Sequence, residues 1–204
     1  MTDDVKALRD DLAFLRALAE DGRSAPLTGG SILAAAGAIF GLASLGQWLV
    51  LTERVAVSPV WLPALWLSAI VLHTILTVAI KRRIGARTTP AGARVNRDAW
   101  TGVAIGCVAL FAALGLASWR AQTWVLIGFT PTIVLVLYGA AWWVSASVTK
   151  IAWIRAVALG AFASAVALAM LATSPLIWLA YAAALFLLAF LPGLALMRRA
   201  AAGT

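Results

Sequence analysis

Residues 81–97 read KRRIGARTTPAGARVNR, and long apolar runs flank this stretch on both sides. It contains six of the sixteen Lys and Arg residues of the chain: Lys81, Arg82, Arg83, Arg87, Arg94 and Arg97. In a soluble protein such a basic stretch would indicate a nucleic-acid patch. Between two hydrophobic spans it is typical of a cytoplasmic loop that sets membrane topology and contacts anionic lipid. We therefore expect the lipid bilayer, and no nucleic acid, to be its partner.

The composition as a whole indicates that lipid surrounds most of the chain. Of the 204 residues, 63% are hydrophobic and only 12% are charged, whereas soluble domains average about 25% charged residues. Residues 1–30 carry six acidic and four basic side chains, a net charge of −2. The remainder carries twelve basic and two acidic side chains, a net charge of +10. This basic excess lies between the apolar runs, as anionic lipid and the positive-inside rule both predict.

Six apolar runs, each near the roughly 20 residues that a helix needs to cross hydrocarbon, follow one another with short connections. Backbone groups find no water inside a bilayer, so runs this apolar are expected to be helices. They predict an all-α, polytopic membrane bundle over residues 31–198, after a helix and linker in residues 1–30 and before a cytoplasmic tail at 199–204. The expected spans are residues 32–51, 60–80, 100–118, 124–145, 151–171 and 176–197.

The basic residues also predict which side of the membrane each connection faces. Fourteen of the sixteen lie within or next to the N-terminal segment, the second–third loop, the fourth–fifth loop and the tail, and the other loops hold only Arg54 and Arg120. The positive-inside rule therefore places both termini in the cytoplasm. Tryptophans near the ends of the expected spans are typical of the aromatic belts of polytopic proteins, and only Trp66 is expected to lie deeper.

A weak internal repeat predicts that the six spans form three helical hairpins. Span openings that carry a helix-capping pattern are Ser58-Pro59, Thr123-Trp124 and Ser174-Pro175. Small-residue pairs within the odd spans are Gly37-x-x-x-Gly41, Gly102-x-x-x-Gly106 and Gly160-x-x-x-Ser164. Because such small faces let helices approach closely, each hairpin would join a small-residue helix to a bulkier one.

Residues 3–21 precede the spans and predict a cytoplasmic amphipathic helix with a heptad seam. The seam residues recur at spacings of 3, 4, 3 and 4, and they are Val5, Leu8, Leu12, Leu15 and Ala19. In a parallel pair of such helices, Asp4 would face Arg9 of the other copy. We expect this helix to form a homo-oligomer or to bind a cytoplasmic protein. The alternative is docking on the membrane domain or on the bilayer, and the net acidic charge counts against the bilayer.

Candidate polar groups inside the membrane are few, because no Asp, Glu, Lys or Arg lies well inside an expected span. Counting from the span ends places His73, Cys107 and Tyr138 at similar depth, and Thr77 shares a helix face with His73. A structural His73–Tyr138 hydrogen bond would satisfy both groups, because buried polar groups in lipid need partners. The alternative is a role of His73 in handling a ligand or protons. One His and one Cys are too few for a zinc site, so neither a metal nor a cofactor is expected.

Two prolines inside expected spans, Pro131 and Pro192, predict helix kinks. Each ring removes one backbone hydrogen bond and frees a carbonyl four residues earlier, near Ile127 and Leu188. Neighbouring side chains such as Thr130 commonly resatisfy such carbonyls. The alternative is a broken helix that lines a substrate site.

The N-terminal part of the chain carries one family-like pattern. Residues 11–20 read DLAFLRALAE, and Pro26-Leu27 and Gly29-Gly30 follow before the first span. This pattern resembles a group of uncharacterised small bacterial inner-membrane proteins. The resemblance implies a bacterial inner-membrane location and no particular activity.

Motifs of soluble enzymes are absent from the sequence, including Gly-x-Ser-x-Gly, a phosphate-binding glycine loop and His-Glu-x-x-His. We therefore expect a non-enzymatic inner-membrane subunit with a scaffold or regulatory role. The bundle would anchor it, and residues 3–21 would oligomerise or bind the partner. The alternative function is a small transporter or channel for a neutral or apolar solute that uses His73, Thr77 and Tyr138, with Pro131 as a hinge.

Overall fold

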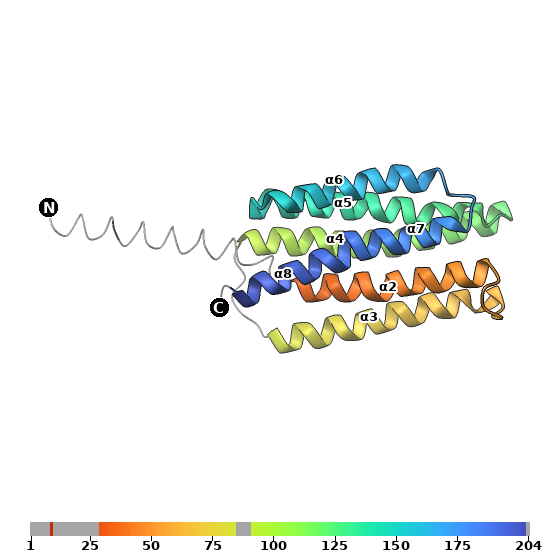
Figure 1. Cartoon of the computed structure of the whole chain (residues 1–204), viewed down its shortest axis with the longest axis horizontal. Coiled ribbons are helices and arrows are strands. Elements are labelled where there is room, and N and C mark those ends of the chain that lie inside the picture. The colour runs from red at the N-terminus through yellow and green to blue at the C-terminus, as the bar shows by residue number, and fades with distance from the viewer. Residues whose placement is uncertain (1–8, 10–28, 85–90, 203–204) are drawn as a thin grey trace.

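A computed structural model describes Arg9, residues 29–84 and residues 91–202, and every regular element in these ranges is helical (Figure 1). Six helical stretches are long and apolar enough to cross a membrane, which confirms the predicted all-α class and the number of spans. These stretches are Gly30–Leu51, Pro59–Arg83, Arg94–Ala121, Val125–Thr149, Ala152–Ala169 and Leu176–Ala201. Predicted residues that lie outside the described ones are Val5, Leu8, Leu12, Leu15, Ala19 and Arg87.

The spans consist of α-helices, some of them extended by turns of a different geometry. The α-helices are α2 (Gly30–Leu51), α3 (Leu62–Ile84), α4 (Ala91–Ala121), α5 (Thr130–Thr149), α6 (Ala152–Ala169), α7 (Leu176–Leu185) and α8 (Leu191–Ala202). The 3₁₀ turns η2 (Pro59–Trp61) and η3 (Val125–Phe129) precede α3 and α5, and the π-helical turn η4 (Phe186–Phe190) joins α7 to α8. Both predicted proline sites lie beside such turns, since Pro131 is in the first turn of α5 and Pro192 follows η4.

Short polar side chains mark the starts of the second, fourth and sixth spans. The hydroxyl oxygens that accept a hydrogen bond from the backbone N–H two residues later are those of Ser58 (3.5 Å), Thr123 (3.3 Å) and Ser174 (3.3 Å). These bonds satisfy N–H groups that have no partner at the start of a helix. The predicted N-cap role is therefore confirmed for Ser58, whereas the N-cap positions of η3 and α7 are Trp124 and Pro175, one residue after Thr123 and Ser174.

The helices run along one long axis and pack as two groups (Figure 1). In one group α2 packs against α3 and also against α7, η4 and α8. In the other group α5 packs against both α4 and α6. Contacts of α7 with α6 and α5 join the two groups. The first span thus pairs with the sixth, and the predicted arrangement as three successive hairpins is not confirmed.

Glycines allow α2 to approach the sixth span closely. A Cβ atom at Gly37 would lie 2.4 Å from the backbone nitrogen of Phe190, and one at Gly41 would lie 3.0 Å from the ring of Phe186. The predicted close-packing role of this small-residue pair is therefore confirmed. The matching pair in the third span is used less closely, because no described atom lies within 4 Å of a Cβ built at Gly102 and one built at Gly106 would lie 3.4 Å from the Leu137 side chain of α5.

The buried core follows α5, α6 and the sixth span, whereas α3 and α4 are largely exposed. The residues that α6 buries recur at spacings of 4, 3, 4 and 3, and they are Ile154, Ala158, Ala161, Ala165 and Leu168. The most apolar windows of α3 and α4 are only 6% and 11% buried, compared with 44% for α2. Among the described residues, the outer faces of α3 and α4 are thus open to the bilayer or to other chains.

Candidate functional site

His73, the sole histidine of the chain, lies on the side of α3 that faces α2. Its Nε2 is 3.5 Å from Oγ1 of Thr77, and its ring centroid is 5.3 Å from that of Phe40 in α2. His73 and Thr77 meet because residues four apart are neighbours on a helix surface. The other ring nitrogen, Nδ1, is buried and has no hydrogen-bond partner among the described residues.

Cys107 and Tyr138 are a second pair of polar residues, on the neighbouring helices α4 and α5. Tyr138 is buried, with its ring edge-on to Trp100 at 5.5 Å, and Cys107 is a half-buried free thiol. In the part of the chain that the structure describes, no hydrogen bond or ring contact joins this pair to His73. The predicted His73–Tyr138 hydrogen bond is therefore not formed. The reason is helix order, because α3 packs on α2 whereas α5 packs on α4 and α6.

Trp66 of α3 contacts side chains of three other helices, α2, α4 and α7. Its indole N–H donates to Oε1 of Gln47 in α2. Its ring centroid lies 6.4 Å from that of Phe40 in α2, 6.2 Å from that of Phe111 in α4 and 5.8 Å from that of Trp178 in α7. Gln47 is buried and is not among the predicted site residues. The available signal was an amide within an apolar run, which predicts an interhelical hydrogen bond.

In the sixth span, the backbone carbonyl that Pro192 frees is hydrogen-bonded by an indole from the fourth span. Pro192 has no N–H to offer to the Leu188 carbonyl, which lies in η4. Trp142 of α5 donates its indole N–H to that carbonyl at 3.0 Å. The prediction that a neighbour resatisfies the carbonyl near Leu188 is confirmed. Pro131 differs, because it lies in the first turn of α5, where a missing N–H costs no intrahelical bond.

Two further polar contacts join neighbouring helices. Ser145 Oγ in α5 lies 2.6 Å from Oδ1 of Asn96 in α4, and it accepts the indole N–H of Trp100 at 3.2 Å. Ser44 Oγ in α2 donates to the Trp178 carbonyl in α7 at 2.8 Å. Like the bonds of Gln47 and Trp142, these contacts use polar groups inside the bundle for helix packing.

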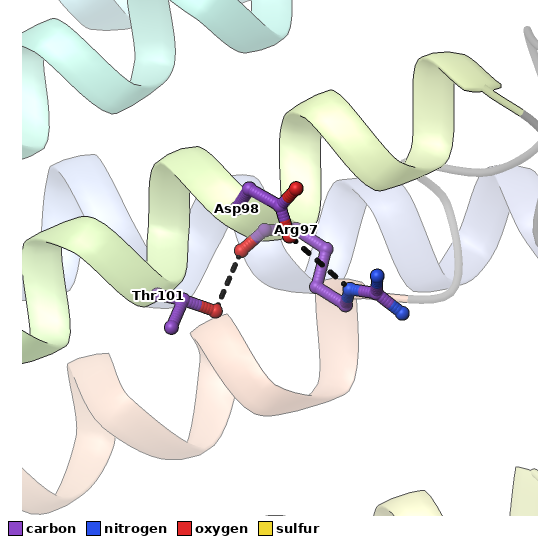
Figure 2. A network of polar contacts seen from close by, with 3 residues as sticks. All are labelled: Arg97, Asp98 and Thr101. Atoms are coloured by element: carbon purple, nitrogen blue, oxygen red, sulfur yellow. Dashed lines mark hydrogen bonds and ion pairs between the residues drawn. The ribbon is translucent and has the colours of Figure 1, made fainter.

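The described basic residues among the predicted topology and lipid anchors lie near helix ends. Residues 81–83 occupy the last turn of α3 and are exposed, and Arg94 on α4 is exposed as well. Arg97 is paired, because its Nε lies 3.5 Å from Oδ1 of Asp98 (Figure 2). Thr101 donates to the Arg97 carbonyl at 2.8 Å in the same network. Both charged side chains are more than half exposed, so the pair contributes little stability.

Only some tryptophans occupy the outward positions that an aromatic belt requires. Exposed indoles are those of Trp61, Trp119, Trp124 and Trp143. Trp142 and Trp178 are instead only 1% and 5% exposed, so their interpretation as belt residues is corrected. An interior indole is stable when its N–H has a partner, and the Leu188 carbonyl supplies one to Trp142.

Two shallow, open hollows in the described part of the chain lie on the outside of the bundle. One follows residues 74–83 of α3 and the other surrounds the α2–η2 connection at residues 50–59. Within residues 29–84 and 91–202, no three His, Cys, Asp or Glu side chains are grouped so as to hold a metal ion. The polar groups at depth thus offer hydrogen bonds, from an imidazole and a hydroxyl on α3 and from a thiol and a phenol on α4 and α5.

Comparison of the chain with protein-family models, with curated proteins and with solved structures finds no match. The function is therefore inferred from the packing and the polar contacts described above.

Proposed function

We propose that this chain is a non-enzymatic subunit of the bacterial inner membrane that assembles with other transmembrane helices through one flank of α4. Both termini and the loop at residues 81–97 lie in the cytoplasm in this proposal, because those segments carry most of the basic residues. The predicted helix at residues 3–21 adds a second contact on the cytoplasmic side. A second copy of the chain is the simplest partner.

The observation that carries the proposal is a stripe of small residues on α4 that is mostly exposed. Gly102, Gly106, Ala109 and Ala113 recur at spacings of 4, 3 and 4, so they share one flank of the helix. Three of the four are exposed, and no described atom lies within 4 Å of a Cβ built at Gly102, whereas one built at Gly106 would lie 3.4 Å from the Leu137 side chain of α5. A groove of this kind in a membrane helix lets another helix backbone approach closely.

The first span supports this interpretation, because it uses the same kind of stripe inside the chain. There Gly37 and Gly41 are covered by Phe190 and Phe186 of η4. Lipid-facing surfaces carry no requirement for small residues, whereas close helix contacts do. The lipid-facing part of α4 has large side chains instead, such as Val108, which is 71% exposed.

Filling this stripe is expected to dissociate the assembly. In a Gly102→Leu/Ala113→Leu variant, two isobutyl groups would occupy the space that a partner helix needs. We expect association to weaken by about tenfold or more, which is about 1.4 kcal/mol. Native mass spectrometry of the full chain in nanodiscs, over a range of protein-to-lipid ratios, measures this change.

The matched control is Ala104→Leu, on the same helix. Ala104 is exposed and lies nine residues, or about two and a half turns, from Ala113, which places it on the opposite flank. The control should keep the wild-type mass. A wild type that is always a single chain, or a double variant that retains its mass, would contradict the proposal. Deleting residues 3–21 from the wild type and from the double variant separates the contribution of the cytoplasmic contact to association from that of the membrane contact.

A second candidate function, transport of a neutral or apolar solute, is supported by one polar atom. His73 Nδ1 is buried and has no partner among the described residues, so a passing ligand could supply its missing hydrogen bond. Thr77 beside it offers a hydroxyl. These groups lie on α3, which is less buried than α5 or α6.

Replacing His73 with phenylalanine tests the transport candidate. The change keeps an aromatic ring against Phe40 and removes both nitrogens, so we expect uptake to fall about tenfold or more while the melting temperature stays near the wild-type value. The measurement is uptake and efflux across a panel of neutral solutes in proteoliposomes. Ser68→Ala is the control, since Ser68 is exposed and bonds only to the Leu65 carbonyl. Unchanged flux in His73→Phe for every solute would dismiss this candidate.

A further inference from the structure

The C-terminal half of α3 carries a shallow, open hollow of about 500 Å³ on its outer face. The described residues that line it are Thr74, Ile75, Val78, Ala79, Arg82 and Arg83. The lining is apolar along most of its length and ends at two guanidinium groups. Ile75 and Val78 are 60% and 43% exposed, so this face is not covered by another described helix.

The hollow faces away from the contacts that hold α3 in the bundle. The side of α3 that faces α2 carries Trp66, Ala69 and His73, of which Ala69 is buried. Val78 lies nine residues from Ala69, which is about two and a half turns and thus the opposite side of the helix. The hollow therefore opens toward the hydrocarbon of the bilayer.

The positive charge beside the hollow is not neutralised within the described residues. No carboxylate in residues 29–84 or 91–202 forms an ion pair with residues 81–83. On α4, by contrast, Asp98 lies against Arg97 (Figure 2). The C-terminus of α3 contributes roughly half a negative charge. Three full positive charges exceed it, so the net field at this helix end attracts anions.

We propose that this hollow binds an anionic glycerophospholipid. Its acyl chains lie along Ile75, Val78 and Ala79, and its phosphate is held by Arg82 and Arg83. The distance along the helix from Ile75 to Arg82 is about 10 Å, which suits the step from the upper acyl carbons to the phosphate. Guanidinium groups bind phosphate through two parallel hydrogen bonds, and their long side chains reach the interface from the end of a span.

A neutral lipid matches this arrangement less well. Zwitterionic headgroups carry a compensating cation, which the same two guanidinium groups repel. Soluble phosphate would satisfy the arginines and leave the apolar part of the hollow unused. The combination of an apolar length with a basic end therefore selects an anionic amphiphile. This site is independent of the proposed assembly, because that contact lies on α4.

The test compares two lipids that share acyl chains, 1-palmitoyl-2-oleoyl phosphatidylglycerol and the corresponding phosphatidylcholine. Binding of each to the purified full chain is titrated by native mass spectrometry. In an Arg82→Gln/Arg83→Gln variant we expect the phosphatidylglycerol affinity to fall about thirtyfold, which is about 2 kcal/mol, while phosphatidylcholine binding changes little. Arg82→Lys/Arg83→Lys keeps the charge and should retain most of the preference.

Arg120→Gln is the matched control, since Arg120 is an exposed basic residue in the last turn of α4 and lies outside the hollow. It should leave the lipid preference unchanged. An equal loss in Arg120→Gln, or an unchanged affinity in the double glutamine variant, overturns the proposal. So does displacement of the lipid by millimolar inorganic phosphate. Ala79→Trp fills the apolar part of the hollow and should weaken the binding of both lipids. If it lowers the oligomer mass and leaves lipid binding unchanged, a protein partner covers the hollow and the proposal fails.

Discussion

Replacing Gly37 with alanine is expected to cause the largest loss of stability among single methyl additions in the first span. The new Cβ would lie 2.4 Å from the backbone nitrogen of Phe190 and 2.8 Å from its Cα, so α2 and η4 would have to move apart. Backbone atoms have no rotamer by which to retreat. Overpacking of a tight core costs about 1–3 kcal/mol, and a backbone obstacle falls at the upper end of that range.

For a chain of this size such a loss lowers the melting temperature by about 10 °C. Tryptophan fluorescence during heating in mild detergent measures the change. Gly115→Ala is the matched control, because no described atom lies within 4 Å of its Cβ position. It should melt at or slightly above the wild-type temperature, since alanine is the better helix former by up to about 1 kcal/mol. Equal melting of the two variants would mean that α2 and η4 are not in close contact.

Truncating Trp142 to alanine is expected to be at least as damaging. Its side chain is 1% exposed, its ring lies edge-on to Trp100 at 5.2 Å, and its N–H is bonded to the Leu188 carbonyl. Removing a buried indole of this kind costs about 3–5 kcal/mol. It also leaves the carbonyl unpaired, because Pro192 has no N–H to replace the lost donor.

The loss of the buried ring and the loss of the hydrogen bond to the Leu188 carbonyl can be measured separately. Trp142→Phe keeps an aromatic ring and removes only the donor and part of the volume, so we expect a loss of about 1–3 kcal/mol. Trp143→Ala is the control at the adjacent position, where the indole is 44% exposed and contacts Arg155. It should cost about 1 kcal/mol or less. The same thermal unfolding experiment ranks all three, and equal losses at Trp142 and Trp143 would contradict the buried role of Trp142.

The structure divides the predicted polar cluster into two separate pairs, His73 with Thr77 and Cys107 with Tyr138. His73 with Thr77 could be predicted, because a spacing of four residues on one helix guarantees proximity. Cys107 and Tyr138 were predicted to share a depth with His73, but depth says nothing about the direction in which a side chain points around its helix. Gln47 and Trp66, which join α3 to α2, required knowledge of which helices are neighbours.

The sequence by itself determined the number of spans, their approximate ends and the freed carbonyl near Leu188. Each of these depends on local properties: the length of an apolar run, a capping hydroxyl, or a proline without an N–H. The pairing of the first span with the sixth, the interior position of Trp142 and the exposure of α3 were decided only by the tertiary structure. The reason is that lipid is as apolar as a leucine side chain, so helices that are apolar on every side carry little pattern that distinguishes a buried face from a lipid-facing one. Close fit between particular small and aromatic side chains selects the neighbours instead, and that fit exists only once the helices are assembled.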